Sequence, residues 1–224
     1  LHYHKSEEAA RQTKAELETF GAQVHLLQAD LTQPDQIQSL FSAFDADLRP
    51  LTFNMLVNSA SLMPVGNPRE LKLQDWDSAL DLNLRAPFLL AQQAAKRMPS
   101  GGLIVNISDI GAQKAWSRYP SYAVSKAGLE SLTKLLARSL APTIRVNAIA
   151  PGLVLPSDVV TPEQWDKLVR NFRSNEPLHW MKSPPSSNSL SATSTLRVRR
   201  LLWMAATRCC NCRQLNRYTR KPIT

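Results

Sequence analysis

A tyrosine and a lysine four residues apart are the first residues of this sequence whose spacing could support chemistry. Tyr122 and Lys126 lie in the segment YAVSK, within a pattern that predicts a helix, so they occupy one helix face a turn apart. A tyrosine with an ordinary pKa of about 10 is a poor acid–base catalyst at neutral pH. A neighbouring lysine stabilises the phenolate and lowers that pKa. The pair predicts a proton donor, although the spacing alone is also common for structural reasons.

An acid, Asp109, stands thirteen residues before Tyr122, just after the apolar segment LIVNI at 103–107. Two interpretations of this acid are open. In the first, Asp109 acts beside the tyrosine in catalysis. In the second, Asp109 is a solvated loop acid, and its neighbour Ser108 supplies the polar group next to the tyrosine.

Short apolar segments alternate with helical patterns and must position these residues. The apolar segments at 23–28, 53–57, 103–107 and 144–149 predict strands. The expected helices cover residues 6–20, 34–44, 75–97 and 120–140. Because helices separate successive strands, we expect right-handed crossovers and a doubly wound α/β fold with a parallel sheet.

Ligands of such folds bind outside the carboxyl ends of the strands. Several small or polar residues follow the predicted strands at that edge. They are Asn58, Ala60, Ser61, Asp109, Pro151 and Gly152. Because Tyr122 and Lys126 begin the helix after Asp109, we expect all of these residues to converge on one edge of the sheet.

Together these segments resemble the short-chain dehydrogenase/reductase family over residues 1–182. The matching segments are LVNSAS at 56–61, LNLRAPF at 82–88, YAVSK at 122–126 and RVNAIAPG at 145–152. The resemblance implies a Rossmann-type fold, NAD(P)-dependent hydride transfer to or from a small molecule, and a homodimer or homotetramer when full length. It implies that Tyr122 supplies the proton, that Lys126 holds the nicotinamide ribose, and that Asn83 organises a proton-relay water.

The acid at position 109 departs from the family pattern, which usually has a serine there. Pteridine reductases carry an aspartate at this position, and the chain is similar to them elsewhere, as in HYHKS at 2–6. A pterin has ring nitrogens to protonate and an aminopyrimidine edge to bind, which suits a carboxylic acid. The resemblance therefore implies a pterin substrate near Asp109, Tyr122 and Met63, although packing explains Met63 equally well.

The resemblance also implies where the cofactor binds. His4, Lys5 and Ser6 follow the strand at which the family reads the adenosine ribose. A lysine and a serine at a helix start suit a 2′-phosphate, so NADPH is expected, the alternative being an ordinary solvated helix start. The pair Asp30 and Leu31 resembles the family's adenine contact, and Asp30 is also explained by helix capping. The other residues expected at the cofactor are Asn58, Ala60, Ser61, Tyr122, Lys126, Pro151 and Gly152.

Both ends of the sequence depart from the family. The family's first strand and TGxxxGxG turn, which wraps the cofactor pyrophosphate, have no counterpart here, and the sequence starts within the second strand. We therefore expect residues 1–182 to form a partial domain, a fragment whose sheet lacks its middle strand. Residues 183–224 are basic and low in complexity, which predicts a disordered or frame-shifted tail.

Charge and composition narrow the possible partners. The tail holds eight of the 27 Lys and Arg and no acid, which leaves 19 basic and 18 acidic residues, a net charge of +1, for residues 1–182. Apart from Trp203 and Tyr218 the tail lacks interleaved aromatics, and it has no recognisable module, so no nucleic-acid partner is expected. A non-catalytic protein that binds nucleic acid or acidic surfaces through this tail is the alternative. The cysteines Cys209, Cys210 and Cys212 fit no common zinc spacing, and no metal is expected.

No apolar stretch approaches the roughly 20 residues of a membrane span, so we expect a cytoplasmic protein without a membrane partner. Three interpretations of its activity remain open from the sequence. The first is an NADPH-dependent pterin reductase. The second is a related enzyme acting on another carbonyl, alcohol or sugar. The third is a truncated, inactive member of the same family.

Overall fold

The computed structural model describes residues 1–48, 51–114, 116–152, 154, 160–171 and 179–181. Its strands are β1 (His2–Tyr3), β2 (Leu27–Gln28), β3 (Met55–Asn58), β4 (Gly102–Ile107), β5 (Ile144–Ala150) and β6 (His179–Met181). Its helices are α1 (Glu7–Glu18), α2 (Pro34–Asp47), α3 (Leu73–Leu80), the π-helical η1 (Asp81–Arg85), α4 (Ala86–Ala95), α5 (Gly111–Lys114), α6 (Pro120–Ser139) and α7 (Pro162–Asn171). The predicted tail, 183–224, lies outside the described residues.

The strands form two sheets. The larger has the order β3-β4-β5-β6, in which β3, β4 and β5 are parallel and β6 pairs antiparallel with β5. The smaller contains β1 and β2, paired in parallel. Within the described part of the chain no ladder joins β1 to β3. The doubly wound, Rossmann-type α/β fold is confirmed.

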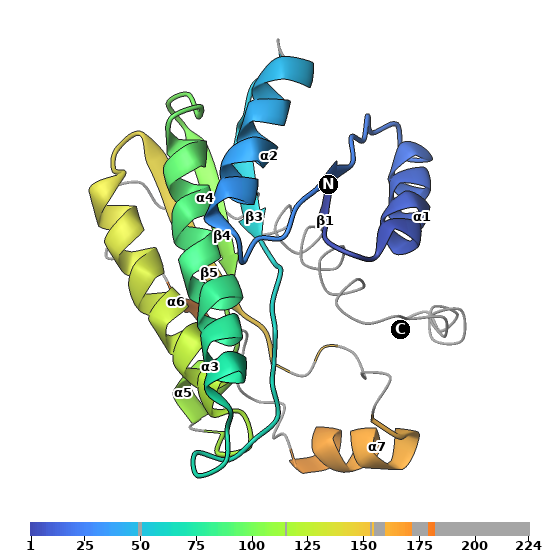
Figure 1. Cartoon of the computed structure of the whole chain (residues 1–224), viewed down its shortest axis with the longest axis vertical. Coiled ribbons are helices and arrows are strands. Elements are labelled where there is room, and N and C mark those ends of the chain that lie inside the picture. Colours follow the sequence, from blue (N-terminus) through green and yellow to red (C-terminus); the bar gives the residue numbers. More distant parts are fainter. Residues whose placement is uncertain (49–50, 115, 153, 155–159, 172–178, 182–224) are drawn as a thin grey trace, which may run out of the picture.

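The main apolar core lies between the larger sheet and the helices α2, α4 and α6, which gather on one side of it (Figure 1). Ile104 and Val146 of the sheet are buried against Leu90 of α4 and Leu136 of α6. Aromatic packing joins α2 to the segment before β3. The Phe41 ring meets Phe53 edge-on, with centroids 5.7 Å apart. These contacts hold the carboxyl ends of β3, β4 and β5 in fixed relation to the start of α6.

Most predicted elements are present, with changes at particular places. The predicted strand 23–28 is reduced to β2, because its partner β1 offers only two residues for pairing. The predicted helix 75–97 is interrupted by η1, where the N–H of Ala86 donates to the carbonyl oxygen of Asp81, five residues back. The sequence analysis did not predict α5, α7 or β6.

Candidate active site

The hydroxyl of Tyr122 and the carboxylate of Asp109 meet at the carboxyl end of β4. Pro120 occupies the first turn of α6, where its missing N–H costs no helical hydrogen bond, and Tyr122 follows in the same turn. The Tyr122 hydroxyl donates a hydrogen bond of 2.9 Å to Oδ2 of Asp109. The other oxygen, Oδ1, accepts a hydrogen bond of 2.6 Å from the N–H of Gly111. The end of β4 and the start of α6 thus bring together Asp109 and Tyr122, two of the predicted catalytic residues.

Burial raises the pKa of Asp109 above the ordinary aspartate value, because a buried carboxylate loses its hydration. The hydrogen bonds from Gly111 and Tyr122 and the positive charge of Lys126 act in the opposite direction but are outweighed. A raised pKa increases the fraction of the acid that is protonated near neutral pH. Asp109 is therefore suited to hold a proton beside the tyrosine hydroxyl.

Lys126 lies over the face of the tyrosine ring. Its Nζ is 5.5 Å from the ring centroid of Tyr122 and donates a hydrogen bond of 2.7 Å to the carbonyl oxygen of Ile107. Only 2% of the lysine is exposed. The ammonium group is thus held between strand β4 and helix α6, where its positive charge favours the ionised forms of both Tyr122 and Asp109.

Ser108 points away from Tyr122. Its hydroxyl lies 3.2 Å from Oε1 of Glu130 and 3.5 Å from the carbonyl oxygen of Lys126, and the residue is 2% exposed. Neighbouring side chains at a strand end leave the backbone in opposite directions. In this structure Asp109, not Ser108, therefore stands beside the tyrosine hydroxyl.

Asn83 lies within η1 and is almost fully buried. Its Oδ1 accepts a hydrogen bond of 2.8 Å from the N–H of Leu62, and its Nδ2 donates to the carbonyl oxygen of Leu62 at 2.7 Å. The same nitrogen is 2.9 Å from the hydroxyl of Ser125 on α6. Asn83 thus ties the loop after β3 to the helix that carries Tyr122, and its predicted role with a water remains a prediction.

The remaining residues predicted at this edge differ in accessibility. Asn58 is buried and donates a hydrogen bond of 2.8 Å to Asn106 of the neighbouring strand. Ala60 is exposed, Ser61 is partly buried, and Met63 is 42% exposed. The carbonyl oxygen of Pro151 accepts from the N–H of Ile110 at 3.3 Å, and Gly152 is partly buried beside it. The main chains after β4 and β5 are therefore joined next to Asp109.

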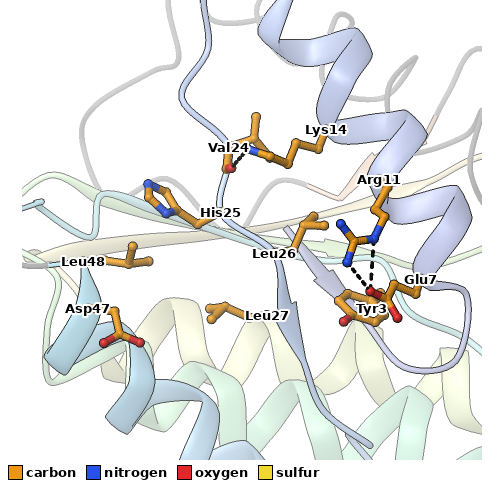
Figure 2. A pocket seen from close by; sticks show the side chains of 10 residues that line it. All are labelled: Tyr3, Glu7, Arg11, Lys14, Val24, His25, Leu26, Leu27, Asp47 and Leu48. Atoms are coloured by element: carbon orange, nitrogen blue, oxygen red, sulfur yellow. Dashed lines mark hydrogen bonds and ion pairs between the residues drawn. The ribbon is translucent and has the colours of Figure 1, made fainter.

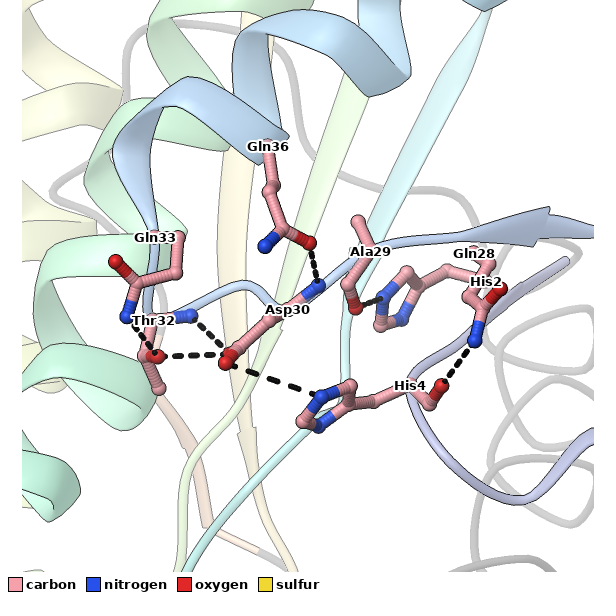
Figure 3. A network of polar contacts seen from close by, with 8 residues as sticks. All are labelled: His2, His4, Gln28, Ala29, Asp30, Thr32, Gln33 and Gln36. Carbon is pink, nitrogen blue, oxygen red and sulfur yellow. Dashed lines mark hydrogen bonds and ion pairs between the residues drawn. The ribbon is translucent and has the colours of Figure 1, made fainter.

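Two of the residues predicted at the adenosine end, His4 and Asp30, lie side by side (Figure 3). Nε2 of His4 lies 3.8 Å from the carboxylate of Asp30, whose Oδ1 accepts from the N–H and hydroxyl of Thr32. The Thr32 hydroxyl is the main cause of a lowered pKa at Asp30. The α2 N-cap is Gln33, not Asp30. Lys5 and Ser6 are exposed at the start of α1, and Leu31 is buried in the core.

A cavity of about 440 Å³ lies elsewhere, between α1, the segment before β2 and the end of α2 (Figure 2). Arg11 and Glu7 form an ion pair on one side of it, and Leu48 lies on the other. None of the predicted catalytic residues lines this cavity. The predicted catalytic residues Asp109 and Tyr122 lie at the carboxyl end of β4, not at this cavity.

The described ranges contain neither a membrane-spanning helix nor a cluster of metal ligands. No helix there is both long and apolar enough to cross a membrane. No group of three His, Cys, Asp or Glu side chains there could hold a metal ion.

A family model described as enoyl-(acyl carrier protein) reductase matches residues 1–191. The chain belongs to the short-chain dehydrogenase/reductase family. One similar member is a short chain dehydrogenase/reductase of Colletotrichum higginsianum, 38% identical over 152 residues, which are 64% of this chain and 55% of that protein. Another is 2-dehydro-3-deoxy-D-gluconate 5-dehydrogenase of Escherichia coli, 34% identical over 63% of this chain and 56% of that enzyme. The chain thus spans little more than half the length of these relatives.

Solved structures of the family are similar to this chain. FolM alternative dihydrofolate reductase 1 of Brucella canis, complexed with NADP, has 33% sequence identity and a TM-score of 0.69, over 77% of this chain and 68% of that one. The Brucella suis protein of the same name, also complexed with NADP, has 35% identity and a TM-score of 0.67, over 75% and 67% of the two chains.

The sequence analysis missed two residues that shape the site. Gly111 is one, because a Cβ built there would come within 2.9 Å of Oδ1 of Asp109 and 2.8 Å of the Trp116 ring. Glu130 is the other, buried behind Ser108. Its position four residues after Lys126 and eight after Tyr122 places it on the same face of α6, a helical periodicity that could have revealed it.

Proposed function

We propose that the protein is an NADPH-dependent reductase of a pterin, in which Tyr122 and Asp109 together supply protons. The observation that carries the proposal is the 2.9 Å hydrogen bond from the Tyr122 hydroxyl to a partly buried acid whose pKa is raised. Reduction of a pterin C=N bond needs a hydride at carbon and a proton at nitrogen. NADPH supplies the hydride, and the chain must supply and replace the proton.

The Asp109–Tyr122 pair can deliver that proton. Tyr122 presents an O–H that is already oriented by Asp109, and a protonated Asp109 can return a proton to the tyrosine after it is used. Lys126 stabilises the phenolate that forms in between. A serine in place of Asp109 could orient the tyrosine but could not ionise at physiological pH. This difference supports a substrate that needs more than a hydroxyl beside the tyrosine.

The donor set at the first helix is compatible with NADPH. His4, Lys5 and Ser6 combine two basic side chains and a hydroxyl at the N-terminal end of α1, where helix N–H groups favour an anion. Lys5 and Ser6 are exposed and so accessible to a 2′-phosphate. The NADP complexes of the two Brucella proteins support this choice of cofactor.

The proposal is tested by comparing NADPH oxidation with a dihydropterin and with a simple ketone, using the protein, two active-site variants and one control variant. Tyr122→Phe should lower both rates by about 10²–10⁴-fold, because the proton donor is lost. Asp109→Ser should lower the dihydropterin rate by a similar factor and spare the ketone rate, since serine is the usual family residue. Asp35→Ala, an exposed acid on α2, is the matched control and should change neither rate.

Other outcomes favour the alternatives. The relative that acts, by its name, on 2-dehydro-3-deoxy-D-gluconate supports a sugar or ketone substrate for this chain. Turnover of the ketone alone, insensitive to Asp109→Ser, would select that alternative. If tryptophan fluorescence shows NADPH binding but no substrate turns over, the pterin proposal fails and the cofactor proposal stands. If neither binding nor turnover is found, the inactive alternative is preferred.

A further inference from the structure

A buried carboxylate lies behind the candidate active site and takes no part in the proposed proton transfer. Glu130 is 7% exposed, on the fourth turn of α6. Its Oε1 accepts from the hydroxyl of Ser108 at 3.2 Å, and its Oε2 lies 3.4 Å from Nε2 of Gln113. Buried charges are costly unless they are hydrogen-bonded, so these contacts require an explanation.

The partners of Glu130 bracket the residue that contacts the tyrosine. Ser108 precedes Asp109, and Gln113 lies four residues after it, in α5. Glu130 therefore forms hydrogen bonds with both ends of the segment 108–113, and it lies on the helix that also carries Tyr122. The side chains of Ser108 and Asp109 point in opposite directions. The hydrogen bond that holds the Ser108 hydroxyl at Glu130 therefore orients the Asp109 carboxylate toward Tyr122.

Three hydrogen bonds from main-chain N–H groups of the segment 108–113 do not run to α6. The hydrogen bond from Gly111 to Asp109 lies within the segment. The hydrogen bonds from Ser108 to Ile149 and from Ile110 to Pro151 join it to β5 and the residue after β5. Among the described residues, side-chain hydrogen bonds join this segment to α6 between Asp109 and Tyr122, between Ser108 and the carbonyl oxygen of Lys126 at 3.5 Å, and from Ser108 and Gln113 to Glu130. Of these, the bonds to Glu130 involve both ends of the segment, and α5 also packs against α6.

We propose that Glu130 is a positioning residue that holds the segment 108–113 against α6, so that the Asp109 carboxylate stays within hydrogen-bond distance of the Tyr122 hydroxyl. The inference rests on the proposed function, since it concerns the same proton-donating pair. It assigns the buried carboxylate a role through Asp109 and not at the substrate.

The role predicts which substitutions are tolerated. Glu130→Gln keeps both hydrogen bonds, because the amide oxygen can accept from Gln113 while the amide nitrogen donates to Ser108, whose hydroxyl then donates to the Lys126 carbonyl. Glu130→Ala removes both and frees Asp109 to turn toward solvent. The pKa of Asp109 should then fall toward the ordinary aspartate value, because its elevation is caused by burial.

The test is a titration of the Asp109 carboxyl by carbon-13 NMR in the protein and its variants, with Asp109→Asn to assign the resonance. We expect a downward shift of the Asp109 pKa in Glu130→Ala and no shift in Glu130→Gln. If Glu130→Ala fails to fold, Ser108→Ala and Gln113→Ala each remove one of the two contacts and should each give part of the shift.

The matched control is Thr133→Val, which removes a different buried polar contact from the same face of α6. The Thr133 hydroxyl accepts from Nδ2 of Asn106 at 2.8 Å and donates to the carbonyl oxygen of Leu129 at 2.7 Å, and both partners lie outside the segment 108–113. An unchanged Asp109 pKa in Glu130→Ala, with only a loss of stability, would overturn the inference, and so would an equal shift in Thr133→Val. The titration needs neither cofactor nor substrate, so failure of the pterin assay leaves its result intact.

Discussion

Asp109 is partly buried, although aspartate is normally charged and hydrated, and its burial therefore affects the stability of the folded state. Its raised pKa means that the folded state binds the proton more tightly than the unfolded chain does. Protonation therefore favours folding at acid pH. That contribution is fully present below the ordinary aspartate pKa and is lost as the pH rises through the raised pKa.

Replacing the Asp109 carboxyl by an amide should remove the free-energy cost of burying its charged form, a cost that increases with pH. We expect Asp109→Asn to match the wild-type free energy of unfolding at acid pH and to exceed it at neutral pH, since each unit of pKa difference corresponds to about 1.4 kcal/mol. The amide can still accept from Gly111 and donate to Tyr122. Urea unfolding across the acid-to-neutral range measures the difference.

Asp30→Asn provides a control of opposite sign. The pKa of Asp30 is lowered by the Thr32 hydroxyl, so its charged form favours the folded state. This variant should be less stable than wild type at neutral pH, and the difference should vanish as the pH falls through the lowered pKa. If both variants respond to pH in the same direction, the assignment of the two shifts is wrong.

Among the secondary-structure elements, η1 carries the buried side-chain amide of Asn83. Asn83→Ala would remove the hydrogen bonds to the N–H and carbonyl of Leu62 and to the buried hydroxyl of Ser125, and loss of a buried hydrogen-bond partner costs about 1–3 kcal/mol. We expect a loss of stability of that order and faster amide exchange at Leu62. Urea unfolding and hydrogen–deuterium exchange measure the two effects.

Asn67→Ala is the matched control for this loss. The Asn67 side chain also makes two hydrogen bonds, to the N–H of Arg69 and to Glu70, but it is exposed. Water can replace both bonds, so its removal should cost much less. Equal losses in the two variants would mean that burial of the Asn83 amide does not matter.

The elements themselves were largely predictable, because β4, β5 and α6 carry continuous apolar or periodic patterns. The meeting of Asp109 with Tyr122 was also anticipated, since strand ends and helix starts share one edge in this fold. The π-helical turn was not, because DLNLR is an ordinary helical sequence and only packing against α6 and Leu62 reveals the extra residue. The direction of Ser108 likewise depends on the buried Glu130, a partner 22 residues away.

For the molecule as a whole, the division into two sheets leaves strand edges without partners in the described residues. β3 is paired with β4 on one side only, and its Met55 is 41% exposed. An edge strand with unpaired N–H and C=O groups can pair with another chain, and a lysine on such an edge discourages this.

Met55→Lys should therefore reduce self-association. We expect less light scattering on concentration or heating, with little change in the unfolding midpoint, because the side chain is already partly exposed. Leu135→Lys adds the same charge at an exposed position of α6, away from any edge, and should have a smaller effect. A reduction of equal size in both variants would point to net charge instead of the strand edge.

The π-helical turn also sets the rotational phase of the long helix that runs through it. Before the turn, α3 packs against α6; after it, α4 packs against α2 and β3. One residue of an α-helix corresponds to a rotation of about 100°. Deleting one residue from Asp81–Arg85 would therefore swing the α3 face away from α6 if α4 kept its place. In this family member, single-residue deletions should be tolerated in the loop before α3 and rejected in the middle of the helix.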